Sequence, residues 1–337
     1  MAYRPRVDLD REVHDRLILR TAPGAVDYLA DAVRALGAQM RRREPDGLVV
    51  EYRGPLRPLA EIRYFDVLAV EPDALDDSLK DGVLAALLPE GPVRFRVGQL
   101  GEDRWAARDR LVADHGWVNA PEAWDVNIEP GGMEIGGLFL TQRFGELLRT
   151  PASTNPVVAA VMVRLAKIEP GQLVVDPFCG AGTLLVYAAE MARPGRLVGL
   201  DTQARWLRMA AENLARRSSR TPAVAGSAGV AGCPGTLVRA DAAQLPLGTG
   251  TAHRVVANLP FGKRVGSHRV NEALYPAALA EIARVLPGGG RAVLLTDDKR
   301  LFRETVQRTR LVRVVKEVVL ARGGLHPSVY VVVKRGR

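Results

Sequence analysis

Cysteine is scarce in this 337-residue sequence, which contains only Cys179 and Cys233. Neither lies in a CxxC pair or at another spacing typical of a disulfide framework or a zinc site. Long apolar runs are also missing. No stretch reaches the roughly 18 apolar residues of a membrane-spanning helix, and the charged segment at residues 1–16 lacks the apolar core of a signal peptide. We therefore expect a cytoplasmic protein that binds neither a metal nor a membrane.

Acidic residues are outnumbered by basic ones. The 47 Lys and Arg residues exceed the 38 Asp and Glu residues, which gives a formal net charge of +9. A positive excess favours association with a polyanion such as nucleic acid. An arginine-rich, GC-rich coding sequence would give the same excess, so the charge indicates a class of partner and says nothing about the fold.

The length and the 47% hydrophobic content predict two domains. We place the boundary near Arg149, just before the break at Thr150-Pro151. The elements predicted in residues 1–149 are a helix over 26–36, a strand over 48–52, a strand over 93–97 that alternates with arginine, a helix over 103–115, and a closing strand pair over 124–128 and 133–140. Residues 1–149 are therefore predicted to form an α+β module.

Strand and helix patterns alternate throughout residues 150–337. An amphipathic helix begins at Asn155-Pro156. After it, strands are predicted at 173–176, 197–201, 236–240, 253–257, 291–296, 311–320 and 328–335, and helices after 182, at 204–216 and at 274–286. This order is typical of a parallel, doubly wound α/β sheet, which the last two strands close as a hairpin. The Gly-, Ala- and Ser-rich segment 218–235 has no apolar period and is predicted to be a mobile insertion.

A glycine turn follows the first strand of this predicted sheet. The strand ends in Asp176 and leads through Pro177-Phe178-Cys179-Gly180-Ala181-Gly182-Thr183 into a helix. Two glycines allow close approach of a ligand, and the helix N-terminus offers free N–H groups to a carboxylate. A dinucleotide-binding GxGxxG is not met because Leu185 stands where the third glycine belongs, and no GxxxxGK[ST] sequence is present. The turn therefore predicts a ligand site at the carboxyl edge of the sheet.

Acidic residues also follow the second and third strands. Asp201 ends the second strand, where a carboxylate can accept hydrogen bonds from both hydroxyls of a ribose, and Asp241 follows the third strand, within reach of an adenine amine. A single Asp at such a place is as often a solvated or helix-capping residue. Three at consecutive strand ends favour a nucleoside-containing ligand.

The fourth strand runs into Asn258-Leu259-Pro260-Phe261, beside the predicted ligand crevice. A conjugated amine is a poor nucleophile because its lone pair is delocalised, so its attack on a sulfonium methyl needs acceptors that hold both N–H bonds. The Asn258 amide oxygen and the Leu259 carbonyl can supply them. Pro260 stiffens the loop, and Phe261 can stack on an extruded planar base. A plain turn with a core Phe could have the same sequence, but the position of this motif after the fourth strand favours a catalytic role.

These residues match a known family. DPFCGAGT at 176–183, Asp201, Asp241 and NLPFGKRVGSH at 258–268 together resemble the THUMP-associated RNA methyltransferases that make N2-methylguanosine in tRNA. The helix TNPVVAAVMVRLA at 154–166 resembles the one that precedes the first glycine motif in that family. The resemblance implies a Rossmann-like, seven-stranded class I methyltransferase domain at 150–337 with S-adenosylmethionine as cofactor. The cofactor-binding residues it implies are Thr154, Asn155, Asp176, Phe178, Gly180, Gly182, Thr183, Asp201, Asp241 and Asn258.

Residues 1–149 are similar to the ferredoxin-like and THUMP modules of the same family, at 21–38 and at 124–153. The resemblance implies that this part is an RNA-binding module that grips the acceptor end of a tRNA. Its candidate phosphate contacts are Arg41, Arg42, Arg43, Arg94 and Arg96, joined by Lys263 and Arg264 beside the catalytic motif. Arginine-rich segments are also common on plain solvated surfaces.

Two other functions remain open. The same chemistry could act on N6 of adenine or on a glutamine amide, which use related Asn-Pro-Pro-Tyr/Phe motifs, although Leu259 in place of the first Pro favours guanine. A catalytically silent RNA-binding protein could keep the fold, but intact Asp176, Asp201, Asp241 and Asn258 argue against it. We predict an S-adenosylmethionine-dependent tRNA guanine-N2 methyltransferase that acts as a monomer.

Overall fold

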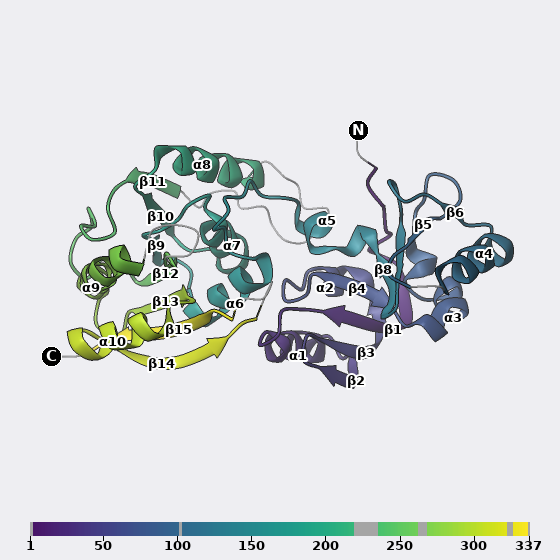
Figure 1. Cartoon of the computed structure of the whole chain (residues 1–337), viewed down its shortest axis with the longest axis horizontal. Helices are drawn as coiled ribbons and strands as arrows, with labels where there is room; N and C mark the ends of the chain where they lie inside the picture. The colour runs from purple at the N-terminus through teal and green to yellow at the C-terminus, as the bar shows by residue number, and fades with distance from the viewer. Residues whose placement is uncertain (1–2, 101–102, 219–234, 262–267, 322–325, 336–337) are drawn as a thin grey trace. The chain divides into compact units, whose positions relative to one another are not determined.

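The computed structural model describes residues 3–100, 103–218, 235–261, 268–321 and 326–335. The chain divides between Glu146 and Leu147 into two compact units, each with its own core. The elements of the first unit run from purple to teal in Figure 1, and those of the second run from teal to yellow. Whether the units act as the RNA-binding and catalytic domains expected on either side of Arg149 stays a prediction. No described helix is both long and apolar enough to cross a membrane.

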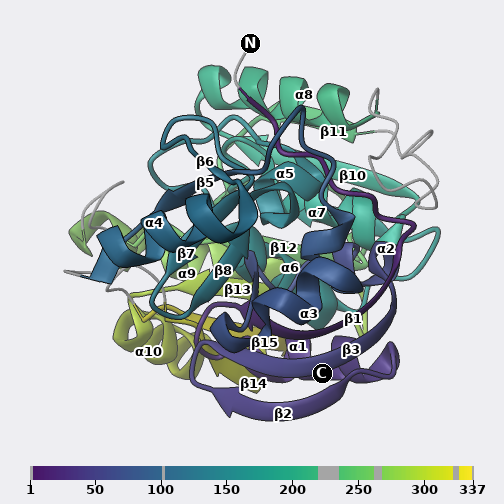
Figure 2. The same cartoon turned by 90° about the vertical axis from the view of Figure 1, so that its right-hand side faces the viewer.

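The described residues of the first unit form an eight-stranded sheet in the order β2-β3-β1-β4-β8-β7-β5-β6. The strands are β1 (Glu12–Arg20), β2 (Gln39–Glu44), β3 (Gly47–Pro55), β4 (Val67–Val70), β5 (Arg94–Val97), β6 (Val118–Asn119), β7 (Val126–Glu129) and β8 (Gly132–Ile135). The helices are α1 (Val26–Ala35), α2 (Leu56–Ala60), α3 (Leu75–Lys80), α4 (Arg104–His115) and α5 (Leu140–Phe144). Figure 2 gives a second view of these elements. The unit is an α+β module.

The buried apolar residues of the first unit lie at positions that the sequence pattern predicts. Leu17 and Leu19 of β1 are fully buried, and α1 buries Leu29 and Val33 before Gly37 ends the helix with a φ of +77°. One expected element is too long, because the strand predicted over 133–140 ends at Ile135.

A pair of glycines explains that early end. The next two residues are Gly136 and Gly137, which begin a short 3-10 helix, η4 (Gly136–Leu138). A Cβ at Gly136 would lie 2.8 Å from the Trp124 ring, and one at Gly137 would lie 2.7 Å from Val7. The chain therefore leaves the sheet where only glycine fits against its neighbours.

The described residues of the second unit form a seven-stranded sheet in the order β11-β10-β9-β12-β13-β15-β14. The strands are β9 (Leu173–Asp176), β10 (Arg196–Asp201), β11 (Gly235–Arg239), β12 (Arg254–Asn258), β13 (Arg291–Thr296), β14 (Val312–Val319) and β15 (Ser328–Lys334). The first five strands in that order are mutually parallel, and β15 is antiparallel to both β13 and β14. The predicted doubly wound, seven-stranded α/β fold is confirmed. The expected insertion at 218–235 lies almost wholly outside the described residues.

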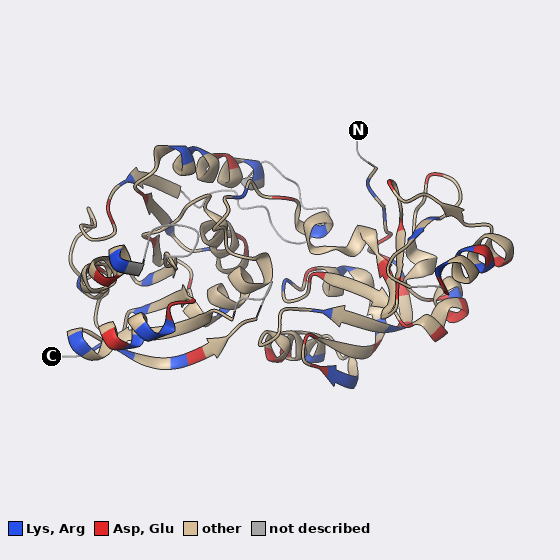
Figure 3. Cartoon of the chain, in the orientation of Figure 1, with Lys and Arg blue, Asp and Glu red and all other residues tan. Residues whose placement is uncertain are grey.

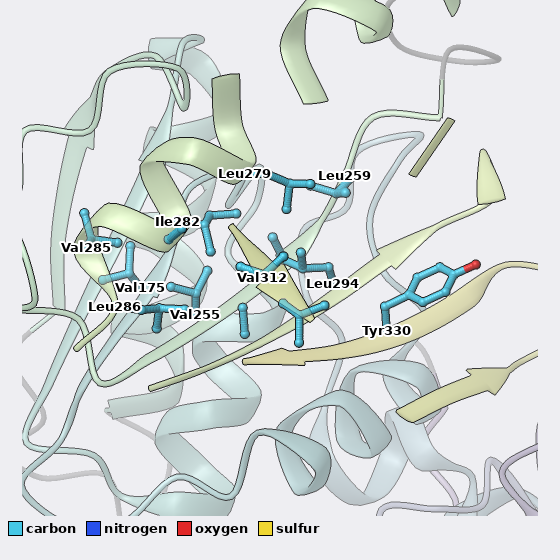
Figure 4. Packing of buried hydrophobic residues seen from close by; sticks show 14 of the residues in the cluster. Val175, Val255, Leu259, Leu279, Ile282, Val285, Leu286, Leu294, Val312 and Tyr330 are labelled. Carbon is cyan, nitrogen blue, oxygen red and sulfur yellow. The ribbon is translucent and has the colours of Figure 1, made fainter. Parts of the chain in front are cut away.

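Helices cover this second sheet. They are α6 (Pro156–Ala166), α7 (Thr183–Ala192), α8 (Ala204–Ser218), α9 (His268–Val285) and α10 (Lys299–Thr309). Figure 4 shows Ile282 and Val285 of α9 packed over Val175 and Val255 of the sheet. Tyr330 of β15 stacks on a phenylalanine of α10, with 4.3 Å between ring centroids. This packing fixes the strand ends from which the site is built.

Candidate active site

Three polar side chains end neighbouring strands at one edge of the second sheet. Asp176 ends β9, Asp201 ends β10 and Asn258 ends β12. Because β10 and β12 flank β9 in parallel, their carboxyl ends meet at the same edge. Ligands of open α/β sheets bind outside these carboxyl ends. The structure therefore brings the three residues to the place expected for a ligand.

The glycine loop after β9 is fixed by its own N–H groups. The N–H of Phe178 donates to Asp176 Oδ1 at 3.0 Å, that of Cys179 to the Leu200 carbonyl at 2.9 Å, and that of Gly180 to Asp201 Oδ2 at 3.1 Å. Thr183 begins α7 and is buried. The loop thus joins the ends of β9 and β10, and these three backbone N–H groups hold its shape.

The two glycines of the loop differ in their surroundings. Gly180 has a φ of +51°, and a Cβ built on it would meet no described atom within 4 Å. Gly182 has a φ of +77°, and its Cβ would lie 3.0 Å from the Cβ of Ala210 on α8. Gly182 is therefore required for packing of the loop against α8, whereas Gly180 faces open space where a ligand can approach the backbone.

Asp201 at the end of β10 and Asp241 after β11 can each accept further hydrogen bonds. Asp201 is partly buried, and its Oδ1 accepts the N–H of Gln203 at 2.8 Å. Asp241 is exposed and accepts the N–H of Ala243 at 2.9 Å. A carboxylate oxygen accepts more than one hydrogen bond, so both side chains can still accept from a ligand.

Asp176 is fully buried, and this burial raises the pKa of its carboxyl from the ordinary 3.8 to about 8, with a smaller contribution from the nearby Asp201 charge. Between about pH 4 and pH 8, the Asp176 carboxyl is therefore protonated in the folded chain and ionised in the unfolded chain. Rising pH in that window favours unfolding.

We expect the free energy of unfolding to fall across this window in the wild type and to stay flatter in Asp176→Asn. Urea titrations at several pH values measure it. The exposed Asp241→Asn serves as control, and parallel curves for wild type and Asp176→Asn would contradict the prediction.

The amide of Asn258 has a defined orientation. Its Nδ2 donates to the Ala152 carbonyl at 3.0 Å, so the two ends of the amide are distinguished. Its Oδ1 is buried, and no described residue donates to it. The next residue is held too, because the N–H of Leu259 donates to the Leu295 carbonyl of β13 at 2.9 Å. Phe261 is half-buried at the end of the described loop. A buried acceptor without a donor is costly unless a ligand completes it.

Thr154 and Asn155 lie at the start of α6. Asn155 is the N-cap of the helix, and its Oδ1 accepts the N–H of Val157 at 3.0 Å. Thr154 is buried. The capping bond gives Asn155 a structural role, and the contact of both residues with a cofactor stays a prediction.

Sequence reasoning missed Asn213 on α8, which is fully buried. Its Nδ2 donates to the Ala181 carbonyl of the glycine loop at 2.8 Å and to the Leu148 carbonyl at 3.0 Å, and its Oδ1 accepts the N–H of Leu148 at 2.8 Å. The only signal in the sequence was a polar residue between Ala210 and Leu214, on the apolar side of α8. One amide therefore ties the first residues of the second unit to the glycine loop.

The arginines proposed as phosphate contacts in the first unit have protein partners. Arg41 pairs with Glu51, Arg42 with Glu44 at 3.0 Å, and Arg43 with Asp27 at 2.7 Å. Arg94 lies over the ring of Tyr3, and Arg96 lies over Trp124 while its Nε donates to Asn127. Figure 3 shows basic and acidic segments interspersed over this unit. RNA would have to compete with these contacts, and RNA binding by these arginines stays a prediction. Lys263 and Arg264 lie outside the described residues.

Comparisons with known proteins identify the family of the second unit. Residues 147–328 match the model of the family UPF0020, described as RMKL-like, methyltransferase domain. The tRNA (guanine(6)-N(2))-methyltransferase THUMP3 of Bos taurus is 37% identical over 183 residues, which are 53% of this chain and 36% of that protein. The chain thus matches only about a third of the length of this relative.

Solved structures resemble most of the chain, with residues of both units covered. TrmN from Thermus thermophilus has a TM-score of 0.72 and 25% identity, covering 95% of this chain and 99% of that one. SMU.472, a putative methyltransferase solved in complex with S-adenosylhomocysteine, has a TM-score of 0.64 and 16% identity, covering 96% and 99%. The second likeness concerns the fold alone.

Proposed function

Because the chain belongs to the UPF0020 family of RMKL-like methyltransferase domains, we propose that it transfers a methyl group from S-adenosylmethionine to the exocyclic N2 of a guanosine in tRNA. The observation that carries the proposal is the buried Oδ1 of Asn258, which no described donor completes at the edge where ligands bind. The name of the bovine relative, a tRNA guanine-N2 methyltransferase, supports guanine as the target base. The match to TrmN over 95% of the chain supports a role for both units.

The described residues fit S-adenosylmethionine. Asp201 would hold the ribose hydroxyls, Asp241 the adenine amine, and the N–H groups at the start of α7 the carboxylate of the methionine part. The open space at Gly180 admits the ligand beside the backbone. When bound there, the cofactor supplies an electrophilic methyl group. The family match to a methyltransferase domain supports S-adenosylmethionine as the cofactor.

The chain contributes positioning and hydrogen-bond acceptance to the reaction. Asn258 Oδ1 and the Leu259 carbonyl accept the two N–H bonds of the guanine amine, which removes its lone pair from conjugation and aims it at the methyl group. Phe261 stacks on the extruded base. The methylated nitrogen is then cationic and releases one proton, so a strong base is not required. A substrate that completes Asn258 Oδ1 also relieves the cost of leaving it unpartnered.

We test the proposal by incubating the full chain with tritiated S-adenosylmethionine and total tRNA, followed by nucleoside digestion and mass spectrometry. We expect label in N2-methylguanosine. A transcript in which inosine, which lacks the exocyclic amine, replaces guanosine at the modified position is the matched control and should take up no label. Label at N6 of adenosine would instead indicate adenine methylation. Label found only in an added protein would indicate methylation of a glutamine amide.

The two loop glycines give a paired prediction. Gly180→Ala should weaken cofactor binding about tenfold or more because its new methyl group enters the ligand space, and it should lower stability only by the cost of a left-handed residue, about 1–2 kcal/mol. Gly182→Ala should destabilise the protein by about 2 kcal/mol or more, because strain adds to the contact with Ala210. Calorimetric titration and thermal unfolding of both variants measure this. Equal losses of stability in the two would refute the distinction.

We place the reaction in the cytoplasm, where tRNA is modified, and expect the enzyme to act as a monomer without a metal. Among the described residues, no three His, Cys, Asp or Glu side chains are grouped as a metal site requires. The net charge of +9 supports the choice of a polyanionic substrate.

A further inference from the structure

The catalytic loop is held at Pro260 by two side chains of α9. The Pro260 carbonyl accepts a hydrogen bond from Asn271 Nδ2 at 2.7 Å and another from the Tyr275 hydroxyl at 2.8 Å. Asn271 and Tyr275 are four residues apart, so they share one face of the helix. Their side chains are 0% and 1% exposed. Burial of two polar side chains is unfavourable unless their hydrogen bonds form, so the contact is a specific feature of the core.

The Tyr275 hydroxyl belongs to a chain of hydrogen bonds with one direction. It lies 2.8 Å from Thr296 Oγ1, at the end of β13, and Thr296 Oγ1 accepts the N–H of Asp298 at 3.0 Å. A carbonyl can only accept, so the single proton of Tyr275 goes to Pro260 and the proton of Thr296 goes to Tyr275. Burial raises the pKa of Tyr275 well above its ordinary value, which keeps this proton in place. This series of hydrogen bonds thus connects β13 to the catalytic loop.

This chain bears on the neighbouring peptide group. The Leu259 carbonyl lies in the same planar peptide unit as the Pro260 nitrogen. The proline ring fixes its own φ, the α9 contacts fix the Pro260 carbonyl, and the Leu259 N–H is fixed on Leu295. The peptide unit that carries the Leu259 carbonyl is therefore restrained from both sides.

We propose that Tyr275 and Asn271 are positioning residues for methyl transfer, which aim the Leu259 carbonyl at the amine of the target base. Thr296 orients the Tyr275 hydroxyl from behind. The inference rests on the proposed function, in which the Leu259 carbonyl is one of the two acceptors. It assigns a role to polar residues of α9 and β13 that act through the Pro260 carbonyl.

The first test is kinetic and uses the full chain. Tyr275→Phe should lower kcat about tenfold or more, while KM for tRNA and Kd for S-adenosylmethionine change less than about twofold, because only the aim of an acceptor is lost. Tyr330→Phe removes the hydroxyl of another buried tyrosine in the same core and should keep wild-type kcat. Thr296→Val should lower kcat, and Thr296→Ser, which keeps the hydroxyl, should restore it. The proposal is overturned if kcat falls as much in Tyr330→Phe as in Tyr275→Phe, or if kcat of Tyr275→Phe equals that of wild type.

A second measurement is independent of activity. Hydrogen exchange at the Leu259 amide should be faster in Tyr275→Phe than in wild type and unchanged in Tyr330→Phe, because loss of one restraint loosens the loop. Unchanged exchange in Tyr275→Phe overturns the role of this residue. If the wild type methylates no tRNA, the proposed function fails, and the exchange rates still decide whether Tyr275 holds the loop.

Discussion

Asn258→Ala is expected to lower kcat for methyl transfer by about a hundredfold or more and to change Kd for S-adenosylmethionine less than about threefold. The variant loses the buried Oδ1 acceptor and the bond from Nδ2 to the Ala152 carbonyl. Removal of one oriented group from a charge-stabilising site typically lowers kcat by two to three orders of magnitude. Initial rates with tRNA, together with calorimetric titration of the cofactor, separate the two effects.

A matched variant refines this first prediction. Asn258→Asp keeps an oxygen at the site but loses the amide donor that faces Ala152, so its free carboxylate is no longer oriented. We expect its kcat to remain far below wild type, since the orientation of the acceptor decides the rate. If Asn258→Ala were as active as wild type on total tRNA, the catalytic assignment of the whole loop would be wrong. A loss confined to cofactor affinity would instead move Asn258 to the cofactor site.

Asp201→Ala is expected to weaken the binding of S-adenosylmethionine about fiftyfold, with a smaller loss of kcat at saturating cofactor. The carboxylate accepts hydrogen bonds from the N–H groups of Gly180 and Gln203. Its removal therefore loosens the glycine loop and also removes the proposed acceptor for the ribose hydroxyls. Loss of one hydrogen bond to a charged group is worth about 1.5–3 kcal/mol, or between tenfold and more than a hundredfold in affinity. Calorimetric titration measures this directly.

Asp201→Asn is the control for this second prediction. Asparagine retains one acceptor oxygen and can keep one of the two backbone bonds, so its affinity should lie between those of wild type and the alanine variant. Asp297→Asn, which changes an acidic residue after β13, should bind the cofactor as wild type does. Wild-type affinity in Asp201→Ala would remove Asp201 from the site.

The second sheet was predictable because its parallel strands β9, β10, β12 and β13 are largely buried and therefore read as continuous apolar runs. The strand predicted at 291–296 has the same bounds as β13. The carboxyl ends of such strands also identify the site, so Asp176, Asp201 and Asn258 could be proposed from position alone.

Elements with few apolar residues were missed. The strand β2 consists of QMRRRE, is almost wholly exposed, and is a strand only because β3 pairs with it at the sheet edge. The helix α10 buries little besides Leu301, Phe302 and Val306 among many charged residues. In both cases tertiary pairing or packing decides the structure, and local periodicity does not report it.

The residues that orient the site were also out of reach. Ala152 contacts Asn258 across 106 positions of the chain, and Tyr275 meets Pro260 and Thr296 from a separate helix. Such partners carry no spacing signal, because the fold alone brings them together. Sequence reasoning finds the residues that end strands, and the structure adds those that aim them.

The bond network of Asn213 has a consequence for synthesis on the ribosome. Leu148 emerges 65 residues before the asparagine that completes both of its backbone hydrogen bonds. Until α8 has left the exit tunnel, Leu148 therefore lacks these two hydrogen bonds. We expect the first unit to fold as an independent body during that interval, before Asn213 joins Leu148 to the Ala181 carbonyl of the glycine loop.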